Sequence, residues 1–336
     1  MRRDRFQQLA SIFLTLGIAA AADVYGPVMG IVADPSGQTI RPLRGMPGGA
    51  TVAGPIDLGG ASVVALWPRQ NRAIVSSASG LSIATVASDG TVSRADTGAA
   101  PDFQPTIVAF SPSGSLAALY DSTANAMVFA GNAPVLPSTL PAAVKALAIS
   151  DGAAPLIAGA LADGAGSIFV ADGQGHAQTL SGFRDVSALA FVGATTDLAI
   201  ADQRARRVLL IHDPLSGNAP QILFSVPAIS QGPIQIASSA DGVVLAVLAG
   251  AGSSESSGAP QRGIAAHGPE RRATLGLLRI ADQQWTEVDC NCTPQKLAPL
   301  RGNAVFRLTD AVDQPVWILD GDSSPARISF VPAVQP

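Results

Sequence analysis

The most basic stretch of the chain follows an aspartate between two apolar segments. Asp202 precedes Arg204, Arg206 and Arg207, and the segments on either side have the composition of buried strands. Guanidinium groups bind carboxylates and phosphates through paired hydrogen bonds, so this loop is a candidate site for an anionic ligand. The alternative is a solvated loop whose charges pair with one another, which would contribute little to stability.

Both cysteines of the chain lie in one Cys-Asn-Cys sequence, at Cys290 and Cys292. In an oxidising compartment, two thiols this close could form a small disulfide ring. We expect such a bond to make a connector more rigid, because closing so short a loop contributes little to stability. Free thiols and a redox or metal-binding pair are the alternatives. A metal site would need His or carboxylate partners, and the sequence does not cluster them nearby.

Histidine could contribute acid–base chemistry, but the three histidines, His176, His212 and His267, are far apart in sequence. His212 and Asp213 could act as an acid–base pair if they faced a cleft, although a turn is expected there. The sequence contains no nucleophile elbow, phosphate-binding loop or zinc-protease motif. Repeated Asp-Gly pairs, which could suggest calcium, are interpreted as turns. We therefore predict no catalytic residue, no metal and no cofactor.

Composition excludes several classes of partner. Of the 336 residues, 47% are hydrophobic and 14% are charged, so the chain can form a large core. The net charge is −4 and the only lysines are Lys145 and Lys296, which argues against nucleic-acid binding. Aromatic residues make up 5%, too few for an extended stacking surface. The expected partner is a protein or a small molecule.

The N-terminus has the pattern of a secretory signal peptide. Three arginines within the first five residues precede an apolar run from Leu9 to Ala22 that ends in three alanines. This run is short for a membrane-spanning helix, which needs about 20 residues. We predict a signal peptide over 1–22, cleavage between Ala22 and Asp23, and a periplasmic or extracellular protein. An uncleaved anchor and a buried helix are the alternatives.

One strand–turn–strand unit recurs along the chain, and its clearest copy is Phe110–Leu119. The first strands of successive units end at Leu66, Phe110, Ile149, Phe191 and Ala237, with separations of 44, 39, 42 and 46 residues. A four-stranded unit of about 40–45 residues is the blade of a β-propeller. We predict an all-β propeller of four-stranded blades as a single domain over 23–336. Six units and an N-terminal hairpin favour seven blades, one of them irregular, with six as the alternative.

The turn of this unit resembles a known repeat. Ser111-Pro112-Ser113-Gly114 followed by a strand is similar to the WD40-like repeat of the TolB and YVTN propeller groups, and Ser150-Asp151-Gly152 and Ser239-Ala240-Asp241-Gly242 match it in part. The segment from Cys290 to Gly321 resembles uncharacterised secreted propellers of soil bacteria such as Acidobacteria. The resemblance implies a fold. The named groups include binding proteins and lactonases, so it implies no single activity.

We expect a secreted or periplasmic module that binds a ligand or a protein. The alternative is a propeller hydrolase of the lactonase type, with a site built from loops of several blades. Carboxylates or histidines converging at the centre of one face would favour the enzyme, whereas a channel lined by small uncharged residues would argue against it. Residues 250–272, rich in Ser, Gly and Pro, are predicted to be a flexible insertion and a candidate for recognition. A component of a larger envelope assembly would instead expose a broad apolar patch.

Overall fold

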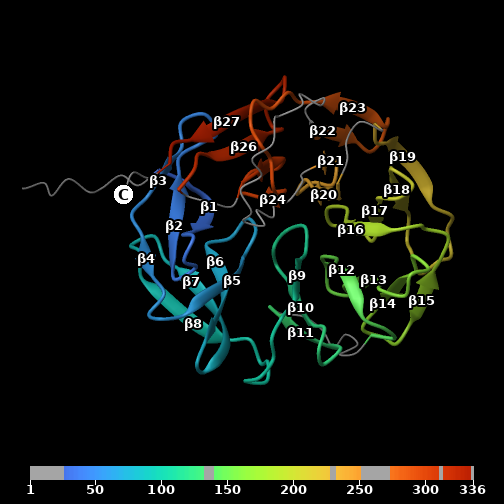
Figure 1. The fold of residues 1–336 in the computed structure, drawn as a ribbon, viewed down its shortest axis with the longest axis horizontal. Helices are drawn as coiled ribbons and strands as arrows, with labels where there is room; N and C mark the ends of the chain where they lie inside the picture. Colours follow the sequence, from blue (N-terminus) through green and yellow to red (C-terminus); the bar gives the residue numbers. More distant parts are fainter. Residues whose placement is uncertain (1–25, 132–139, 228–231, 251–272, 310–312, 334–336) are drawn as a thin grey trace, which may run out of the picture.

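Seven β-sheets stand around a common axis in the computed structural model of the chain (Figure 1). The structure describes residues 26–131, 140–227, 232–250, 273–309 and 313–333. Within these ranges, six sheets have four strands and one has three, and neighbouring strands are antiparallel. The fold is a seven-bladed β-propeller, so the predicted fold class and the favoured blade number are confirmed. No helix in the described ranges is long and apolar enough to cross a membrane.

Blades 2 to 7 each run outward from an innermost strand. The innermost strands are β5 (Ser62–Leu66), β9 (Ile107–Phe110), β12 (Val144–Ile149), β16 (Val186–Phe191), β20 (Ile234–Ser238) and β24 (Ala298–Pro299). The second strands are β6 (Arg72–Ser77), β10 (Ala117–Asp121), β13 (Ile157–Leu161), β17 (Leu198–Asp202), β21 (Val244–Ala249) and β25 (Val305–Arg307). The third strands are β7 (Gly80–Val86), β11 (Ala126–Ala130), β14 (Ile168–Ala171), β18 (Arg207–Ile211), β22 (Thr274–Arg279) and β26 (Val316–Asp320). The outer strands are β8 (Val92–Asp96), β15 (Ala177–Leu180), β19 (Gln221–Ser225), β23 (Gln284–Glu287) and β27 (Arg327–Val331). Residues 132–139, which follow β11 in blade 3, lie outside the described residues.

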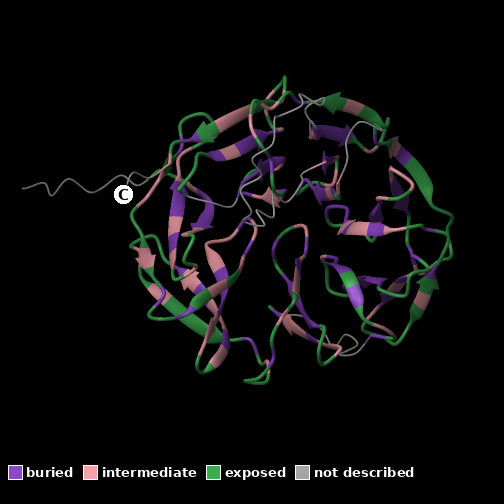
Figure 2. Ribbon diagram, viewed as in Figure 1, coloured by how far each residue is buried: buried purple, intermediate pink, exposed green. Residues whose placement is uncertain are grey.

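Seven apolar clusters of buried residues fill the seven gaps between neighbouring blades. One of them joins Tyr120 and Met127 of blade 3 to Ile149 and Ile157 of blade 4. Each sheet is apolar on both faces, so each face needs a neighbouring blade to cover it. The second strands β10, β13 and β17 are therefore buried along their whole length, whereas the outer strands β8 and β19 are mostly exposed (Figure 2).

The turn after each innermost strand repeats the same hydrogen bonds. In blade 3, the backbone N–H of Ser111 donates to the carbonyl of Leu116 at 3.0 Å, and the Leu116 N–H donates to Ser111 Oγ at 3.1 Å. The hydroxyls of Ser150 and Ser239 accept from Leu156 and Val244 in the same way. Because the corresponding turn of blade 6 starts at Ser239, its innermost strand ends at Ser238. The predicted equivalent position, Ala237, is therefore wrong by one residue.

Most of the Asp-Gly pairs form turns, as the sequence predicts. Gly90, Gly152, Gly164 and Gly242 have φ values between 71° and 104°, a region that glycine adopts without steric cost. In the pair at residues 172 and 173, the left-handed residue is instead Gly175, with φ 93°. Among the described residues, no group of three or more His, Cys, Asp or Glu side chains is arranged to hold a metal ion.

Blade 1 is irregular, as predicted for the N-terminal hairpin. It contains β1 (Val28–Ala33), β2 (Thr39–Arg44), β3 (Thr51–Val52) and β4 (Ile56–Asp57), and both short strands pair with β2. From the inside outward, the sheet of blade 1 therefore consists of β1, then β2, and then the two short strands β3 and β4, which together occupy one strand position.

The direction of β1 is opposite to that of the six innermost strands. The turns that follow the six innermost strands all lie on one side of the ring, which we call the turn face. The opposite side, where these strands begin, is the mouth face. The N–H of Arg301, in the turn of blade 7, donates to Met29 O at 2.7 Å, so β1 begins on the turn face. The Val63 N–H near the start of β5 donates to Gly37 O at 2.8 Å, so the turn after β1 lies toward the mouth face. Blade 1 therefore has the second, third and outer strand positions, and its described residues supply no innermost strand.

Candidate functional site

A cavity of about 430 Å³ lies at the centre of the ring. It is lined by the six innermost strands and the residues that flank them, including Val64, Phe110, Leu147, Leu189, Ile236 and Leu297. The lining side chains are apolar except for the hydroxyls of Thr106, Ser111 and Ser238 and the ammonium group of Lys296. Its volume falls within the roughly 300–1,000 Å³ typical of small-molecule sites. We call this cavity the channel.

The buried side chain of Arg69 closes the channel at the turn face. Arg69 lies in the turn between β5 and β6, and 9% of its surface is exposed. Its guanidinium donates to backbone carbonyls of three other blades, namely Pro112 at 2.9 Å, Ser238 at 3.1 Å, Leu300 at 3.2 Å, Asn303 at 3.2 Å and also Gly302. Blades 3 and 6 lie on different sides of the axis, so a side chain that bonds both of them spans the floor of the channel.

These contacts also close the ring. The described residues of blade 1 supply no innermost strand, and Arg69 joins the turns of blades 2 and 7 directly past it. Burial lowers the pKa of Arg69, and the negative charges of Asp322, Asp151 and Asp241 act in the opposite direction. Five carbonyl acceptors hold the guanidinium, which stays charged at any ordinary pH.

Three further bonds join the turns of neighbouring blades around the floor. Trp67 Nε1 donates to the carbonyl of Gly114 at 2.6 Å, which joins the turns of blades 2 and 3. Ser113 Oγ donates to Asp151 Oδ1 at 2.5 Å, which joins blades 3 and 4. Asn303 Nδ2 donates to Asp241 Oδ2 at 2.7 Å, which joins blades 7 and 6. The turns of blades 2, 3, 4, 6 and 7 therefore form a bonded network on the turn face.

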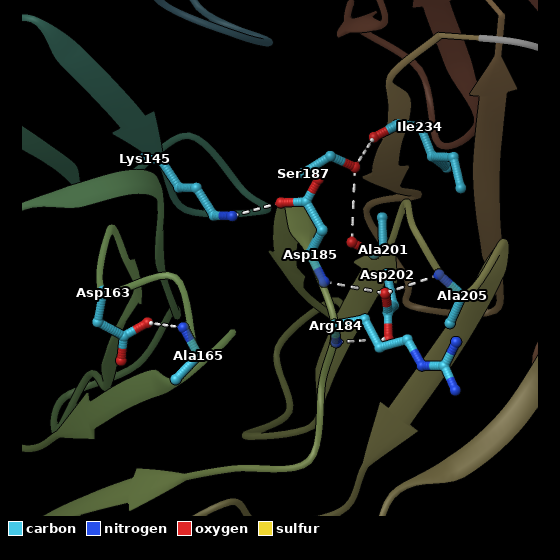
Figure 3. A network of polar contacts seen from close by, with 10 residues as sticks. All are labelled: Lys145, Asp163, Ala165, Arg184, Asp185, Ser187, Ala201, Asp202, Ala205 and Ile234. Atoms are coloured by element: carbon cyan, nitrogen blue, oxygen red, sulfur yellow. Dashed lines mark hydrogen bonds and ion pairs between the residues drawn. The ribbon is translucent and has the colours of Figure 1, made fainter.

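Polar groups surround the channel at the mouth face. The exposed Lys296 immediately precedes the segment leading into β24 and lines the channel. Lys145, near the start of β12, forms an ion pair with Asp185, just before β16 (Figure 3). Ser187 Oγ donates to the Ile234 carbonyl of blade 6 at 2.8 Å. The mouth is thus a polar rim above an apolar wall.

Two of these rim residues occupy β-bulges. The register of β12 against β13 shifts between Val144 and Ala146, and that of β16 against β17 shifts between Val186 and Ala188. The extra residues are Lys145 and Ser187. A third bulge in β5 places Val64, 36% exposed, in the lining of the channel. Bulges change the direction of a side chain and are frequent next to functional sites.

Asp202 holds backbone at the junction of blades 4 and 5. Asp202 is fully buried at the end of β17 and accepts backbone hydrogen bonds from Arg184 at 3.1 Å, Asp185 at 3.2 Å and Ala205 at 3.1 Å (Figure 3). These bonds hold the connector from blade 4 and the turn after β17. Buried carboxylates with several N–H donors commonly fix backbone in this way.

Asp121 occupies the equivalent position at the end of β10. It accepts backbone hydrogen bonds from Gln104 at 2.9 Å and from Thr123 at 2.8 Å. The N–H of Gln104 makes the largest contribution to lowering the pKa of Asp121, against the opposing effect of burial. A repeated aspartate thus joins successive blades.

The arginines of the predicted anion site differ in their surroundings. Arg204 is exposed, Arg206 donates to the Pro227 carbonyl at 2.7 Å, and Arg207 lies 3.7 Å from Asp202. All three are in or beside the turn between β17 and β18, and they are not among the residues that line the channel. A ligand role for this cluster stays a prediction.

Cys290 and Cys292 lie in the connector between β23 and β24. A disulfide joins them, with their Cα atoms 5.0 Å apart, and both pack against the apolar cluster between blades 6 and 7. His212 pairs with Asp197 at 2.9 Å, rather than with Asp213, and is exposed. His176 pairs with Asp172 at 2.7 Å, also on the surface. These histidines lie outside the channel.

Large exposed apolar side chains are scattered over the described surface. Met46, Val64, Ile222, Val243 and Phe330 belong to five different blades. Isolated apolar residues of this kind are normal for a soluble surface. The envelope-assembly hypothesis therefore gains no support from the described part of the chain. Residues 1–22, with the predicted cleavage site between Ala22 and Asp23, lie outside the described residues, as does the predicted insertion from residue 251 onward.

Sequence reasoning missed Arg69 and the convergence of the lysines on the mouth face. One feature of the sequence near Arg69 does depart from the repeat. In blade 2 the turn reads Trp67-Pro68-Arg69-Gln70, where blade 3 has Ser-Pro-Ser-Gly. Arg69 has φ 59°, an uncommon conformation for a residue other than glycine. The departure from the repeat coincides with the residue that closes the channel.

Comparisons with known proteins agree on the fold. No protein-family model and no curated protein matches the chain. The solved structure of Kluyveromyces lactis Hsv2 with its complete loop 6CD covers 90% of this chain and 98% of its own, with 10% identity and a TM-score of 0.54. Streptogramin B lyase covers 88% of this chain and 91% of its own, with 11% identity and a TM-score of 0.51. At sequence identities this low, the structural similarity shows the propeller fold alone. The resemblance to the WD40-like groups stays a prediction.

Proposed function

We propose that the chain is a secreted or periplasmic binding protein that takes a small ligand into the channel. The single observation that supports this most is the form of the channel, with an apolar wall, a floor closed by Arg69 and a polar rim at the mouth face. A cavity of this kind removes apolar surface from water while its rim fixes orientation. The wall is built from the innermost strands, so it needs little ordering on binding.

A lactonase-type hydrolase is the alternative. One structural neighbour, streptogramin B lyase, is an enzyme by its name, and propeller enzymes can assemble sites from several blades. The described lining of the channel offers three hydroxyl groups and one ammonium group, with no carboxylate or imidazole among them. General acid–base catalysis commonly uses those two groups. The lining therefore favours binding over hydrolysis.

Thermal denaturation with amphiphilic probes tests the binding proposal. We expect decanol, decanoate or decyltrimethylammonium to stabilise the folded protein, by about 2.7 kcal/mol when the free probe is at one hundred times its dissociation constant. Val64→Trp should abolish the effect, because Val64 is a bulge residue that faces the channel, so a larger side chain there fills the cavity.

Val243→Trp is the matched control, since Val243 is 48% exposed and does not line the channel. This variant should respond to the probes as the wild type does. If none of the probes shifts the denaturation of the wild-type protein, or if Val64→Trp responds normally, the channel is not the binding site.

Secretion has a separate test. The basic N-terminal residues followed by the run Leu9–Ala22 support export and cleavage. Mass spectrometry of the protein isolated from its native source should give an N-terminus at or near Asp23, and fractionation should recover it outside the cytoplasm. Recovery of the chain with Met1 intact in the cytoplasmic fraction would contradict this part of the proposal.

A further inference from the structure

The innermost strands of blades 3 to 6 each have one edge that no strand of the described ranges pairs with. β9, β12, β16 and β20 lie at the inner end of their sheets, and each pairs only with the second strand of its own blade. A strand at the end of a sheet presents a row of N–H and C=O groups outside the ladder. We call the edge that faces away from the second strand the inner edge, since it faces the axis of the ring.

The hydrogen bonds of the turns identify the residues on the inner edge. Successive residues of an antiparallel pair direct their backbone groups alternately toward the partner strand and away from it. The N–H of Ser150, just after β12, donates to Leu156 O at 2.9 Å, so Ala148 also faces β13 and Leu147 faces the channel. The turns after β9, β16 and β20 fix the alternation in the same way. Besides Ser238, the residues of these strands that face inward and line the channel, which we call the inward residues, are Val108, Phe110, Leu147, Leu189, Phe191 and Ile236.

The chain itself uses the inner edge at both ends of β20. The carbonyl of Ile234 accepts from Ser187 Oγ at 2.8 Å (Figure 3), and the carbonyl of Ser238 accepts from the Arg69 guanidinium at 3.1 Å. These two residues lie two positions before and two positions after Ile236, on the same edge of the strand. The backbone of Ile236 therefore lies between two groups that are already bonded, and it faces the channel.

The innermost strand of blade 7 follows the same alternation. The N–H of Leu297 donates to Gln235 Oε1 at 3.0 Å, away from β25. Pro299, which has no N–H, occupies the next inward position, because the Leu300 N–H bonds back to Val305 O. Proline in a strand is confined to positions that need no ladder hydrogen bond. The inner edge of β24 is thus outside the ladder, as it is on β20.

The hydroxyl groups of the lining already have partners within the chain. Thr106 Oγ1 donates to Tyr120 O at 3.2 Å, and Ser238 Oγ donates to Ser239 O at 2.8 Å. Ser111 Oγ accepts a backbone hydrogen bond in its own turn. Hydrogen bonds from the wall to a ligand should therefore come chiefly from the backbone of the inward residues.

We propose that the channel binds an uncharged compound that carries secondary amides, with its amide N–H and C=O groups bonded to the backbone of the inward residues. This inference rests on the proposed binding function and adds the class of ligand. An amide pairs with a strand edge through the same bonds that a neighbouring strand would make. A charged group at this level would lose its hydration, and the inward residues are all apolar and supply no countercharge.

The inner edges make a hydrocarbon chain an incomplete ligand. A molecule in the channel displaces water from these edges, and each backbone group left without a partner costs free energy. A hydrocarbon chain gains contact with side chains such as Leu147 and Leu189 but leaves the backbone groups without a bond. An amide compound keeps the apolar contact and replaces the bonds to water. Apolar contact should therefore supply affinity for many ligands, and amides should determine which ligand is preferred.

Isothermal titration with a matched pair of probes tests the assignment. The first probe is N-acetyl-leucine methylamide, a diamide whose central N–H and C=O can pair with one inward residue. The second is the ester of the same shape, in which an oxygen atom replaces that N–H. We expect the wild type to bind the diamide about fivefold to tenfold more tightly than the ester, as the loss of one hydrogen bond to a buried carbonyl implies. Val64→Trp should bind neither probe, whereas Val243→Trp should bind both as the wild type does.

Amide hydrogen exchange followed by NMR tests the contact itself. In the free protein, the N–H groups of Leu147, Leu189 and Ile236 should exchange at least about tenfold faster than those of the alanines that follow them, which belong to the ladders. Saturation with the diamide should slow exchange at one or more of the inward residues. The adjacent alanines, at positions 148, 190 and 237, are the matched controls within the same strands.

The possible failures are distinguishable. If the diamide binds no more tightly than the ester, or binds without slowing exchange at any inward residue, the amide assignment is overturned. Decanol binding that Val64→Trp abolishes would then still support the channel as a binding site. If the inward N–H groups of the free protein exchange as slowly as their alanine neighbours, the inner edges are not open and the assignment is likewise overturned. Absence of binding by the diamide, the ester and decanol overturns the proposed function itself.

Discussion

Arg69→Met is expected to destabilise the protein by about 3–5 kcal/mol, because it leaves buried and partly buried carbonyls of three blades without their donor. The affected carbonyls include those of Pro112, Ser238 and Leu300. Methionine keeps much of the apolar volume and the same backbone strain, so the loss reports the hydrogen bonds. Chemical denaturation should show a lower midpoint, and thermal denaturation a decrease of roughly 5–10 °C.

Arg69→Lys should lie between the wild type and Arg69→Met. Lysine keeps the charge, but its compact ammonium cannot bond carbonyls of three blades at once. The matched control is Arg279→Met, because Arg279 is exposed and pairs with the exposed Asp282 at 3.1 Å. Its effect should stay below about 0.5 kcal/mol. If Arg69→Met were as mild as this control, Arg69 would not hold the ring closed.

Gly114→Ala is expected to cost about 3–5 kcal/mol, for two separable reasons. Gly114 has φ 72°, which costs alanine roughly 1–2 kcal/mol. A Cβ at this position would also lie 2.5 Å from the carbonyl oxygen of Pro68, in the neighbouring turn of blade 2. That contact forces the turns of blades 2 and 3 apart and strains the bond from Trp67 Nε1 to Gly114 O. Urea denaturation of the variant measures the total loss of stability from the backbone conformation and the contact together.

Gly90→Ala separates the two contributions. Gly90 has φ 87°, but a Cβ there would have no atom within 4 Å. Its cost should therefore be the conformational part alone, about 1–2 kcal/mol. The remaining difference between the two variants measures the contact between blades. Equal destabilisation by both substitutions would show that the turns of blades 2 and 3 can separate without loss.

Together these two substitutions test how the ring is closed. The described residues of blade 1 supply no innermost strand, so the inner ring is completed by side-chain and turn contacts of blades 2 and 7. The Arg69 contacts join residues about 230 positions apart in the chain, from Arg69 to Leu300 and Asn303. Contacts of this separation form late and are entropically costly, so we attribute much of the cooperativity of the ring to them.

The propeller fold could be predicted from the sequence because its determinants are local and repeated. Short strands that are apolar at most positions specify each unit within a few residues. The turn Ser111-Pro112-Ser113-Gly114 and its partial copies at Ser150 and Ser239 join these strands in pairs. Repetition at about 40 residues then requires the sheets to stack radially, because each blade needs neighbours on both faces. The same local chemistry explains why Asp-Gly pairs were correctly assigned to turns.

The channel and its charges were decided by the tertiary structure. Nothing in the sequence near Arg69 indicates that its guanidinium meets carbonyls of blades 3, 6 and 7, since those partners become neighbours only when the ring closes. Likewise, Asp202 was assigned to a candidate anion site from its neighbours in sequence, which stays a prediction, and the structure adds hydrogen bonds from Arg184 and Asp185 of the preceding connector. The sequence alone therefore determined the repeating blade, in which partners are close along the chain. Folding brought Lys145 and Lys296, 151 positions apart, to one mouth, because the start of every innermost strand faces the same side of the axis.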